Sequence, residues 1–330
     1  MNIYITFDYE LFLSSNTGSV DNCLIKPTKS IIDICNKFNV RTTFFVDTTY
    51  LCKAREYKQL ENEYSKVREQ IKTLSAAGHS IQLHIHPQWF YSSYSEDSGW
   101  DMDYDHYKLS DCPIDDVHKM FDDGIALIEE ITGNACNAYR AGGYSIQTLP
   151  NYADFLRSKE IVVDSSCLCG KASKSVFHEY NYKSIKDSNI FKFNNCIECK
   201  EEDGELYELP ITTFKINPIK YLIKKRNECR ERIVKFGDGK GVYSKLPLIK
   251  KILKKIKMLL FPLYISASID RQTGVMLETI YNQIKKKGYK EMTVIVHPKE
   301  TTNYSLYFLE KFLTKALNDR CKFKTIDDIK

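Results

Sequence analysis

The sequence places ionisable residues two positions apart in two strand-like segments. His84 and His86 alternate with apolar residues in SIQLHIH, and Asp8 and Glu10 follow the apolar run IYITF with the same spacing. Residues i and i+2 of a strand project from one face, so the two imidazoles can converge on one ion. Two histidines and one carboxylate leave open coordination positions, as a catalytic metal site requires. We therefore predict a divalent metal here, rather than a histidine pair that only ends its strand.

Further ionisable residues end other strand-like segments. In α/β barrels the C-terminal ends of parallel strands meet at one mouth, where the strand-to-helix loops converge. We therefore expect these residues to share one site with the two pairs above. The residues concerned are Asp47, Arg140, Asp164 and His297.

The elements that must position these residues alternate along the chain. Short β-branched runs are each followed by a helical pattern, which predicts a parallel sheet and most plausibly a barrel. We expect residues 1–330 to form a single barrel domain of the α/β class. The predicted helices cover residues 27–38, 54–77, 113–131, 149–158, 273–287 and 305–317.

Composition excludes several classes of protein. The chain has 330 residues, of which 43% are hydrophobic and 28% charged, so it is neither disordered nor a short disulfide scaffold. A net charge of +5 predicts no nucleic-acid partner. The eleven cysteines are scattered and the start MNIYITFDYE is unlike a leader, which indicates a reducing cytoplasm. No apolar run approaches the roughly 18–20 residues that span a bilayer.

One basic segment departs from this even composition. Residues 215–257 contain fifteen Lys or Arg and three acids. We expect an insertion at about 212–268, in which residues 245–265 form a basic amphipathic helix. Such a helix suits peripheral contact with an anionic membrane, at the inner face of the membrane for a cytoplasmic protein. Two other interpretations are an outer barrel helix with a solvated lysine face, and recognition of an anionic nucleotide-sugar.

Aromatic residues flank the predicted mouth. Trp89 and Trp100 bracket a long polar loop after the histidine strand, and Tyr144 lies in the loop AGGYS after Arg140. Flat rings beside hydrogen-bonding acids suit a sugar ring, and long loops at a barrel mouth often carry function. We predict that these three residues bind substrate. The alternative for the tryptophans is that they pack a small core of the loop itself.

Five segments, in this order, resemble motifs of the polysaccharide deacetylase family, the NodB-homology or carbohydrate esterase family four group. The resemblance spans nearly the whole chain and implies a distorted (β/α) barrel with metal-dependent removal of an N-acyl group from an amino sugar. The segments are ITFDYE (5–10), GHSIQLHIHPQW (78–89), YRAGGYS (139–145), VVDSS (162–166) and VIVHPKE (294–300).

The resemblance also implies a role for each matching residue. Asp8 corresponds to the general base, Arg140 to the arginine that orients the base, and His297 to the general acid. Asp164 resembles the carboxylate that supports that acid. His84 corresponds to the first metal histidine, with zinc as the expected ion and cobalt or manganese as alternatives.

Three positions depart from the family pattern. The second of two adjacent acids is replaced by Tyr9, so Glu10 is the nearest substitute as a metal ligand. The usual second metal histidine lies four residues after the first, where this chain has Gln88, so His86 must replace it. Gly142 stands where the family usually has proline.

These observations predict a metal-dependent carbohydrate N-deacetylase, a hydrolase of a linear amide C–N bond, in surface polysaccharide or glycan precursor biosynthesis. The expected substrate is an amino-sugar-containing saccharide, either a nucleotide-sugar or a lipid-linked precursor. The alternatives are a non-catalytic saccharide-binding relative and a C–N hydrolase of a non-sugar amide.

Overall fold

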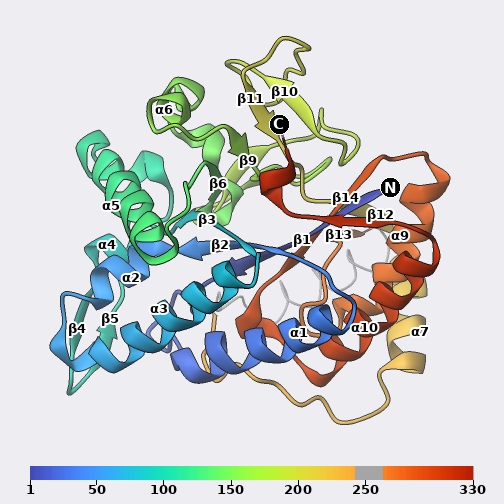
Figure 1. The fold of residues 1–330 in the computed structure, drawn as a ribbon, viewed down its shortest axis with the longest axis horizontal. Helices are drawn as coiled ribbons and strands as arrows, with labels where there is room; N and C mark the ends of the chain where they lie inside the picture. The colour runs from blue at the N-terminus through green and yellow to red at the C-terminus, as the bar shows by residue number, and fades with distance from the viewer. Residues whose placement is uncertain (242–262, 330) are drawn as a thin grey trace, which may run out of the picture.

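The computed structural model describes residues 1–241 and 263–329. Within these ranges, a nine-stranded sheet forms the centre of the molecule, in the order β10-β11-β7-β6-β3-β2-β1-β14, and β15 also pairs with β1 (Figure 1). Its neighbouring strands are parallel except for β10 and β11. The strands are β1 (Asn2–Tyr9), β2 (Thr43–Asp47), β3 (Ser80–Ile85), β6 (Ala138–Ala141), β7 (Val163–Asp164), β10 (Phe191–Phe193), β11 (Leu206–Glu208), β14 (Glu291–Val296) and β15 (Lys322–Lys324).

The sheet curls until its two sides meet through two short connecting segments. Thr212, which follows β11, donates its N–H to the Thr293 carbonyl of β14 at 3.2 Å. Ala267 donates to the Thr212 carbonyl at 2.7 Å and accepts from the Ile295 N–H at 2.9 Å. The predicted α/β fold is confirmed, and its form is a distorted (β/α) barrel.

The helices pack around the outside of this sheet (Figure 1). Helices α3 and α5 contact β3, and α1 packs beside α10. The helices are α1 (Lys26–Lys37), α2 (Thr48–Ala54), α3 (Glu61–Ala76), α4 (Gln88–Tyr91), α5 (Ile114–Thr132), α6 (Tyr152–Ser158), α7 (Pro218–Glu228), α9 (Leu277–Lys286) and α10 (Asn303–Asn318).

The helix predicted at 54–77 is wrong at its N-terminal end. The structure ends α2 at Ala54 and starts α3 at Glu61. Between them Tyr57 adopts an extended conformation (φ −114°, ψ 117°), and its ring packs edge-on against Trp100 at 5.9 Å. Tertiary packing of this aromatic ring overrides the local helical pattern.

Alternate side chains of β1 point to the barrel interior and to the layer between the sheet and the helices. Ile3, Ile5 and Phe7 are fully buried in the large hydrophobic cluster, and the Phe7 ring stacks on Phe44 at 4.3 Å. Tyr4 belongs instead to a second, small cluster, together with residues of β2, β6 and β7. Because side chains alternate between the two faces of a strand, Asp8 shares the face of Tyr4. The strand therefore delivers its carboxylate to the interior.

Three two-stranded hairpins extend from the barrel: β4 (Ser93–Ser95) with β5 (Gly99–Asp101), β8 (Ala172–Lys174) with β9 (Glu179–Asn181), and β12 (Thr213–Ile216) with β13 (Leu263–Ser266). The basic amphipathic helix predicted at 245–265 lies outside the described residues except for 263–265, where the prediction is wrong because these residues pair with β12 as part of β13. The rest of that helix, the single domain over 1–330 and the insertion at about 212–268 stay predictions. In the described part of the chain, no helix combines the length and the apolar character that a bilayer crossing needs.

Candidate active site

Asp8 and Arg140 form a buried ion pair at the C-terminal end of the sheet. Arg140 Nη1 lies 2.6 Å from Asp8 Oδ1, and the two side chains are 0% and 3% exposed. The other two nitrogens of this guanidinium also donate hydrogen bonds. Nε donates to the Ser165 carbonyl at 2.8 Å, and Nη2 donates to the Ser165 hydroxyl at 2.8 Å and to the Thr6 hydroxyl at 3.0 Å. Burial alone would raise the pKa of Asp8, but Arg140 and His297 outweigh it and hold that pKa well below its usual value. Asp8 is therefore an anion with one oxygen already occupied.

His297 faces the other oxygen of Asp8. Its Nε2 lies 3.4 Å from Asp8 Oδ2, while its Nδ1 lies 2.7 Å from Asp270 Oδ2. The His297 backbone N–H also donates to Asp270 Oδ1 at 2.8 Å, so both carboxylate oxygens of Asp270 hold this residue. Burial would lower the pKa of His297, but Asp270 and then Asp8 raise it well above its usual value. Because Asp270 holds Nδ1, Nε2 is the nitrogen of His297 that faces the site.

Glu10, His84 and His86 bring three possible metal ligands together. Their ligand atoms lie within 4.8 Å of one another and all three residues are buried. Glu10 Oε2 is 3.5 Å from His84 Nε2 and 3.0 Å from His86 Nδ1. Glu10 Oε2 and His84 Nε2 are buried yet make no hydrogen bond with a described residue. A divalent cation would satisfy both atoms, so these residues fit the metal that the sequence predicts.

Outer groups orient both histidines of this cluster. His84 Nδ1 lies 2.7 Å from the Arg140 carbonyl, which favours a proton on Nδ1 and leaves Nε2 free to bind a metal. His86 Nδ1 lies 3.2 Å from Asp47 Oδ2, and the His86 backbone N–H donates to Thr49 at 3.1 Å. The contact of His84 fixes its ring with Nε2 toward a metal. In His86 the same nitrogen, Nδ1, faces both Asp47 and Glu10 Oε2.

Lys299 is a cation of the site that sequence reasoning missed. Its Nζ lies 3.0 Å from Glu10 Oε1 and donates to the Leu11 carbonyl at 2.7 Å. Burial would raise the pKa of Glu10, but Lys299 and then His86 hold that pKa well below its usual value. Lys299 therefore occupies Oε1 of Glu10, while Oε2 faces the histidines.

A cavity of about 350 Å³ opens beside this cluster. This volume lies within the range of small-molecule sites. Its wall combines aromatic rings with polar and charged groups, a combination that suits a sugar ring with apolar faces and a polar rim. The lining includes Phe12, His86, Tyr107, Phe177, His178 and Lys299.

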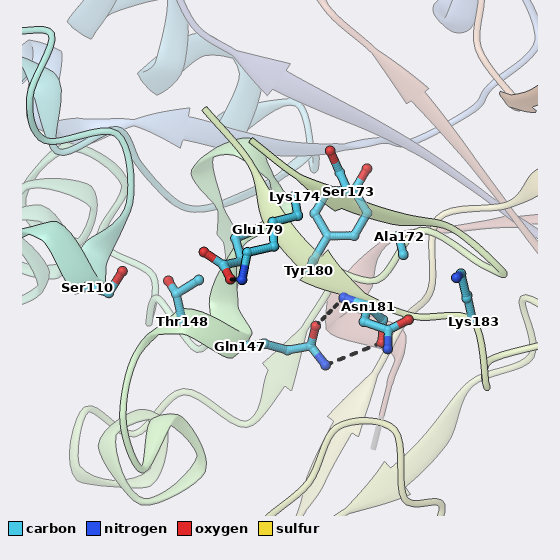
Figure 2. A pocket seen from close by; sticks show the side chains of 10 residues that line it. All are labelled: Ser110, Gln147, Thr148, Ala172, Ser173, Lys174, Glu179, Tyr180, Asn181 and Lys183. Carbon is cyan, nitrogen blue, oxygen red and sulfur yellow. Dashed lines mark hydrogen bonds and ion pairs between the residues drawn. The ribbon is translucent and has the colours of Figure 1, made fainter. Parts of the chain in front are cut away.

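A larger cavity, of about 720 Å³, is lined by residues of the β8–β9 hairpin together with Gln147 and Thr148 (Figure 2). Gln147 braces it by accepting from the Asn181 N–H at 2.7 Å, and Lys174 pairs with Glu179 at 3.0 Å. None of the predicted catalytic or metal residues lines this cavity. Of those residues, His86 lines the smaller cavity.

Asp164 contacts Ser166, and its expected role as the support of His297 stays a prediction. Its carboxylate accepts from the Ser166 N–H at 3.0 Å and from the Ser166 hydroxyl at 2.8 Å, and no contact with His297 is present. Burial raises the pKa of Asp164, and burial together with Asp164 raises that of its neighbour Glu208. The carboxylate that supports His297 is Asp270, which follows β13. Asp270 lies in a bend and does not directly follow a run of apolar, strand-like residues, so the sequence marks it only as an acidic residue.

Trp89 and Trp100 pack into a small buried core of the loop that they flank. Trp89 is 0% and Trp100 8% exposed, and their rings meet edge-on at 4.9 Å. Tyr50 packs against both, so the rings form a small core of their own and offer no face to a sugar. This packing favours the alternative, while their role in substrate binding stays a prediction.

Tyr144 remains close to the site. Burial raises the pKa of its phenol well above the usual value, and Asp8 adds to the effect. Its carbonyl accepts from the Tyr182 hydroxyl at 2.6 Å, and its φ of 62° lies in the left-handed region. The structure thus brings Asp8, Glu10, His84, His86, Arg140, His297 and Tyr144 toward one region, whereas Asp164, Trp89 and Trp100 lie apart from it.

Comparisons with known proteins agree with this picture of the fold. Residues 2–154 match the family model described as polysaccharide deacetylase. A crystal structure from Mycobacterium smegmatis, of a protein provisionally described as a polysaccharide deacetylase, matches with a TM-score of 0.54 and 16% identity over 99% of this chain and 88% of that one. No curated protein matches the chain in sequence.

Two further solved structures match less closely. The Bc1960 peptidoglycan N-acetylglucosamine deacetylase has a TM-score of 0.43 and 12% identity, over 99% of this chain and 87% of that one. The Puue allantoinase has a TM-score of 0.46 and 14% identity, over 99% and 88% of the two chains.

Proposed function

We propose that the protein, whose residues 2–154 match the polysaccharide deacetylase model, is a divergent member of that family and a metal-dependent hydrolase. It would remove an N-acyl group, most simply N-acetyl, from an amino sugar. The family match supports hydrolysis of the deacetylase type. The assignment of metal, substrate and residue roles rests on the geometry of the site.

Glu10, His84 and His86 are the proposed metal ligands, and zinc, cobalt and manganese are the candidate ions. When bound, such an ion acidifies a water molecule and stabilises the negative charge that develops on a carbonyl oxygen. His86 takes the place of the usual second histidine, as its 3.0 Å approach to Glu10 supports. Lys299 holds Glu10 by Oε1, whereas Oε2 is the oxygen that faces His84 and His86.

Asp8 is the proposed general base. Arg140 keeps its carboxylate ionised and fixes Oδ1, so Oδ2 is the oxygen that accepts a proton from the attacking water. The short Asp8–Arg140 contact is fully buried, which makes the direction of Oδ2 rigid. Positioning of this kind lowers the entropic cost of proton transfer.

His297 is the proposed general acid, with Asp270 as the residue that positions it. Asp270 holds Nδ1 and leaves the protonated Nε2 facing the site, where it can donate to the departing amine. The amine is a poor leaving group without that proton. The raised pKa of His297 favours its protonated form, and the lowered pKa of Asp8 favours its ionised form.

The aromatic rings of Phe12, Tyr107 and Phe177 are the proposed sugar contacts. They line the cavity that His86 and Lys299 also line, so a sugar stacked on a ring would place its substituents near the cluster. Lys299 and His178 add polar groups to the same wall. We propose a glycan precursor as substrate, carried by a nucleotide or a lipid, and a cytoplasmic location.

A single observation carries this proposal: His297 Nε2 and Asp8 Oδ2 lie 3.4 Å apart, beside the buried cluster of Glu10, His84 and His86. The test is the loss of an acyl mass from extracted nucleotide-sugars and lipid-linked intermediates incubated with the purified protein. Activity should vanish with a chelator and return with zinc, cobalt or manganese. Asp8→Asn and His297→Ala should each abolish turnover with an unchanged circular dichroism spectrum.

The outcomes separate the alternatives. A protein that binds saccharide, holds no metal and releases no acyl group would be a non-catalytic relative. Metal-dependent hydrolysis of simple amides, without action on amino sugars, would indicate a C–N hydrolase of non-sugar substrates.

A further inference from the structure

Helix α7 turns its polar side toward the barrel. Lys224 donates to the Thr279 hydroxyl at 3.0 Å, and Glu228 pairs with Lys311 at 3.6 Å and with Lys224 at 3.8 Å. Tyr221 is half-buried against the hydrophobic core, and Pro218 is buried. Positions 218, 221, 224/225 and 228 share one face of a helix with 3.6 residues per turn. That face is therefore the inward one.

The aliphatic residues of α7 face outward instead. Ile219, Leu222 and Ile223 are 54%, 47% and 55% exposed. Their spacing of i, i+3 and i+4 puts them on the face opposite the inward one. Globular helices normally bury such a stripe, so an aliphatic stripe that is left outside indicates another partner.

This helix also lies where exposed apolar residues concentrate. Twelve large hydrophobic residues are exposed among those described, and six fall between positions 219 and 264. Figure 1 shows α7 at the periphery of the molecule, with α9 beside it and no element of the described chain outside it. Among the described residues, none covers the outward face, in agreement with the exposure of Ile219, Leu222 and Ile223.

The charges around this face are mostly positive. Lys220 and Arg226 are exposed on α7, and neither side chain forms a salt bridge with a described residue. Arg230, Arg232 and Lys235 follow the helix and are exposed as well. Residues 215–241 hold nine Lys or Arg against three acids. A partner of this face must accept aliphatic side chains and carry negative charge.

We propose that the outward face of α7, formed by Ile219, Leu222, Ile223, Lys220 and Arg226, binds the surface of an anionic lipid bilayer. The aliphatic side chains enter the boundary between headgroups and acyl chains, and the cations contact headgroup phosphates. Charge complementarity favours this partner over a second copy of the chain, whose α7 face carries the same positive charge. The proposal is independent of the hydrolase activity.

The test uses the full chain and sedimentation with vesicles of phosphatidylcholine, alone or mixed with phosphatidylglycerol. We expect binding to the mixed vesicles only, weakened roughly tenfold at high salt because screening removes the electrostatic part. The double variant Leu222→Asp/Ile223→Asp should lose binding, and Lys220→Glu/Arg226→Glu should bind at least about tenfold more weakly. Ile114→Asp is the matched control, since Ile114 is 51% exposed on α5 and should not matter.

A fluorescence measurement locates the contact. The two natural tryptophans are 0% and 8% exposed, so the emission of an indole introduced by Leu222→Trp reports on α7 alone when difference spectra are used. A blue shift on addition of mixed vesicles supports the proposal. Unchanged emission, vesicle binding that survives the aspartate variant, or a dimer in sedimentation equilibrium that the aspartate variant dissociates would each overturn it.

Discussion

The imidazole of His86 lies against Gly142, and the side chain of any other residue at position 142 would collide with it. A Cβ atom at position 142 would come within 2.8 Å of His86 Cδ2 and even closer to the Ile85 carbonyl. The family usually has proline at this position and a histidine two residues later than His86. The two departures are therefore linked, because the ring of His86 needs the room that Gly142 leaves.

Gly142→Ala should push the His86 ring away from Glu10 and weaken zinc binding at least about tenfold, since lost orientation of a ligand costs this much or more. Competition with a chromogenic chelator measures the affinity. Gly241→Ala is the matched control, because a Cβ there meets nothing within 4 Å although Gly241 lines the same cavity. Equal zinc affinity in both variants would contradict the link.

Replacing the ligands tests the cluster itself. Glu10→Gln and His84→Gln should each reduce the metal content of the purified protein from about one ion per chain toward none, because two remaining ligands bind a divalent ion weakly. Elemental analysis after dialysis measures the content. Gln88→Glu is a useful comparison: it adds a carboxylate at the family's usual ligand position and should not restore metal to the His84 variant.

Asp270→Asn should shift the alkaline limb of the rate–pH profile toward lower pH by about one unit or more. Asp270 is the nearest group that raises the pKa of His297, and the general acid must be protonated to act. With a lower pKa, His297 loses its proton at a lower pH. The profile of kcat shows the effect directly. The control is Asp164→Asn, whose profile should keep its alkaline limb; a shift there instead would favour the sequence-based assignment.

Substrate contact should follow the rings that line the cavity. Phe177→Ala should raise KM about five- to tenfold, since a stacked sugar ring loses one of its aromatic partners. Trp100→Phe should leave KM unchanged and lower the free energy of unfolding by about 1–3 kcal/mol, because it alters a packed core. Urea unfolding and steady-state kinetics on both variants check this pair of results. An increase in KM only in the tryptophan variant would show that Trp100, and not Phe177, contacts the substrate.

His79 should make stability depend on pH below neutrality. Burial lowers its pKa to about 4, and its Nδ1 accepts from the Thr42 N–H at 3.1 Å. As the pH falls below about 6.5, His79 therefore takes up a proton in the unfolded chain but stays neutral in the folded one. Stability is fully present above that pH, and about 2 kcal/mol is lost by about pH 5. Urea unfolding at both pH values should show a smaller loss in His79→Gln but not in His118→Gln.

Strand periodicity explains why much of the site was predictable. Asp8, His84 and His297 end buried strands whose apolar pattern is strong, and parallel strands bring such ends together. Asp270 could not be found this way, because it follows a strand whose partner is defined only by tertiary pairing. The burial of Trp89 and Trp100 depends on Tyr50 and Tyr57 from another part of the chain, and one sequence does not show that contact. Lys299 lies in a short turn after β14, where a lysine usually meets solvent.

The guanidinium of Arg140 bonds to β1 and to the segment after β7 while also directing the proposed base. The Arg140 side chain thus both connects neighbouring strands of the barrel and positions the carboxylate proposed to accept a proton. Selection for a faster catalyst cannot change this position without loosening the barrel, so improvement must come from loops such as the one that carries Asp270. In directed evolution, inactive clones with changes at Arg140 should be aggregated, whereas those at Asp270 should remain soluble and merely slow.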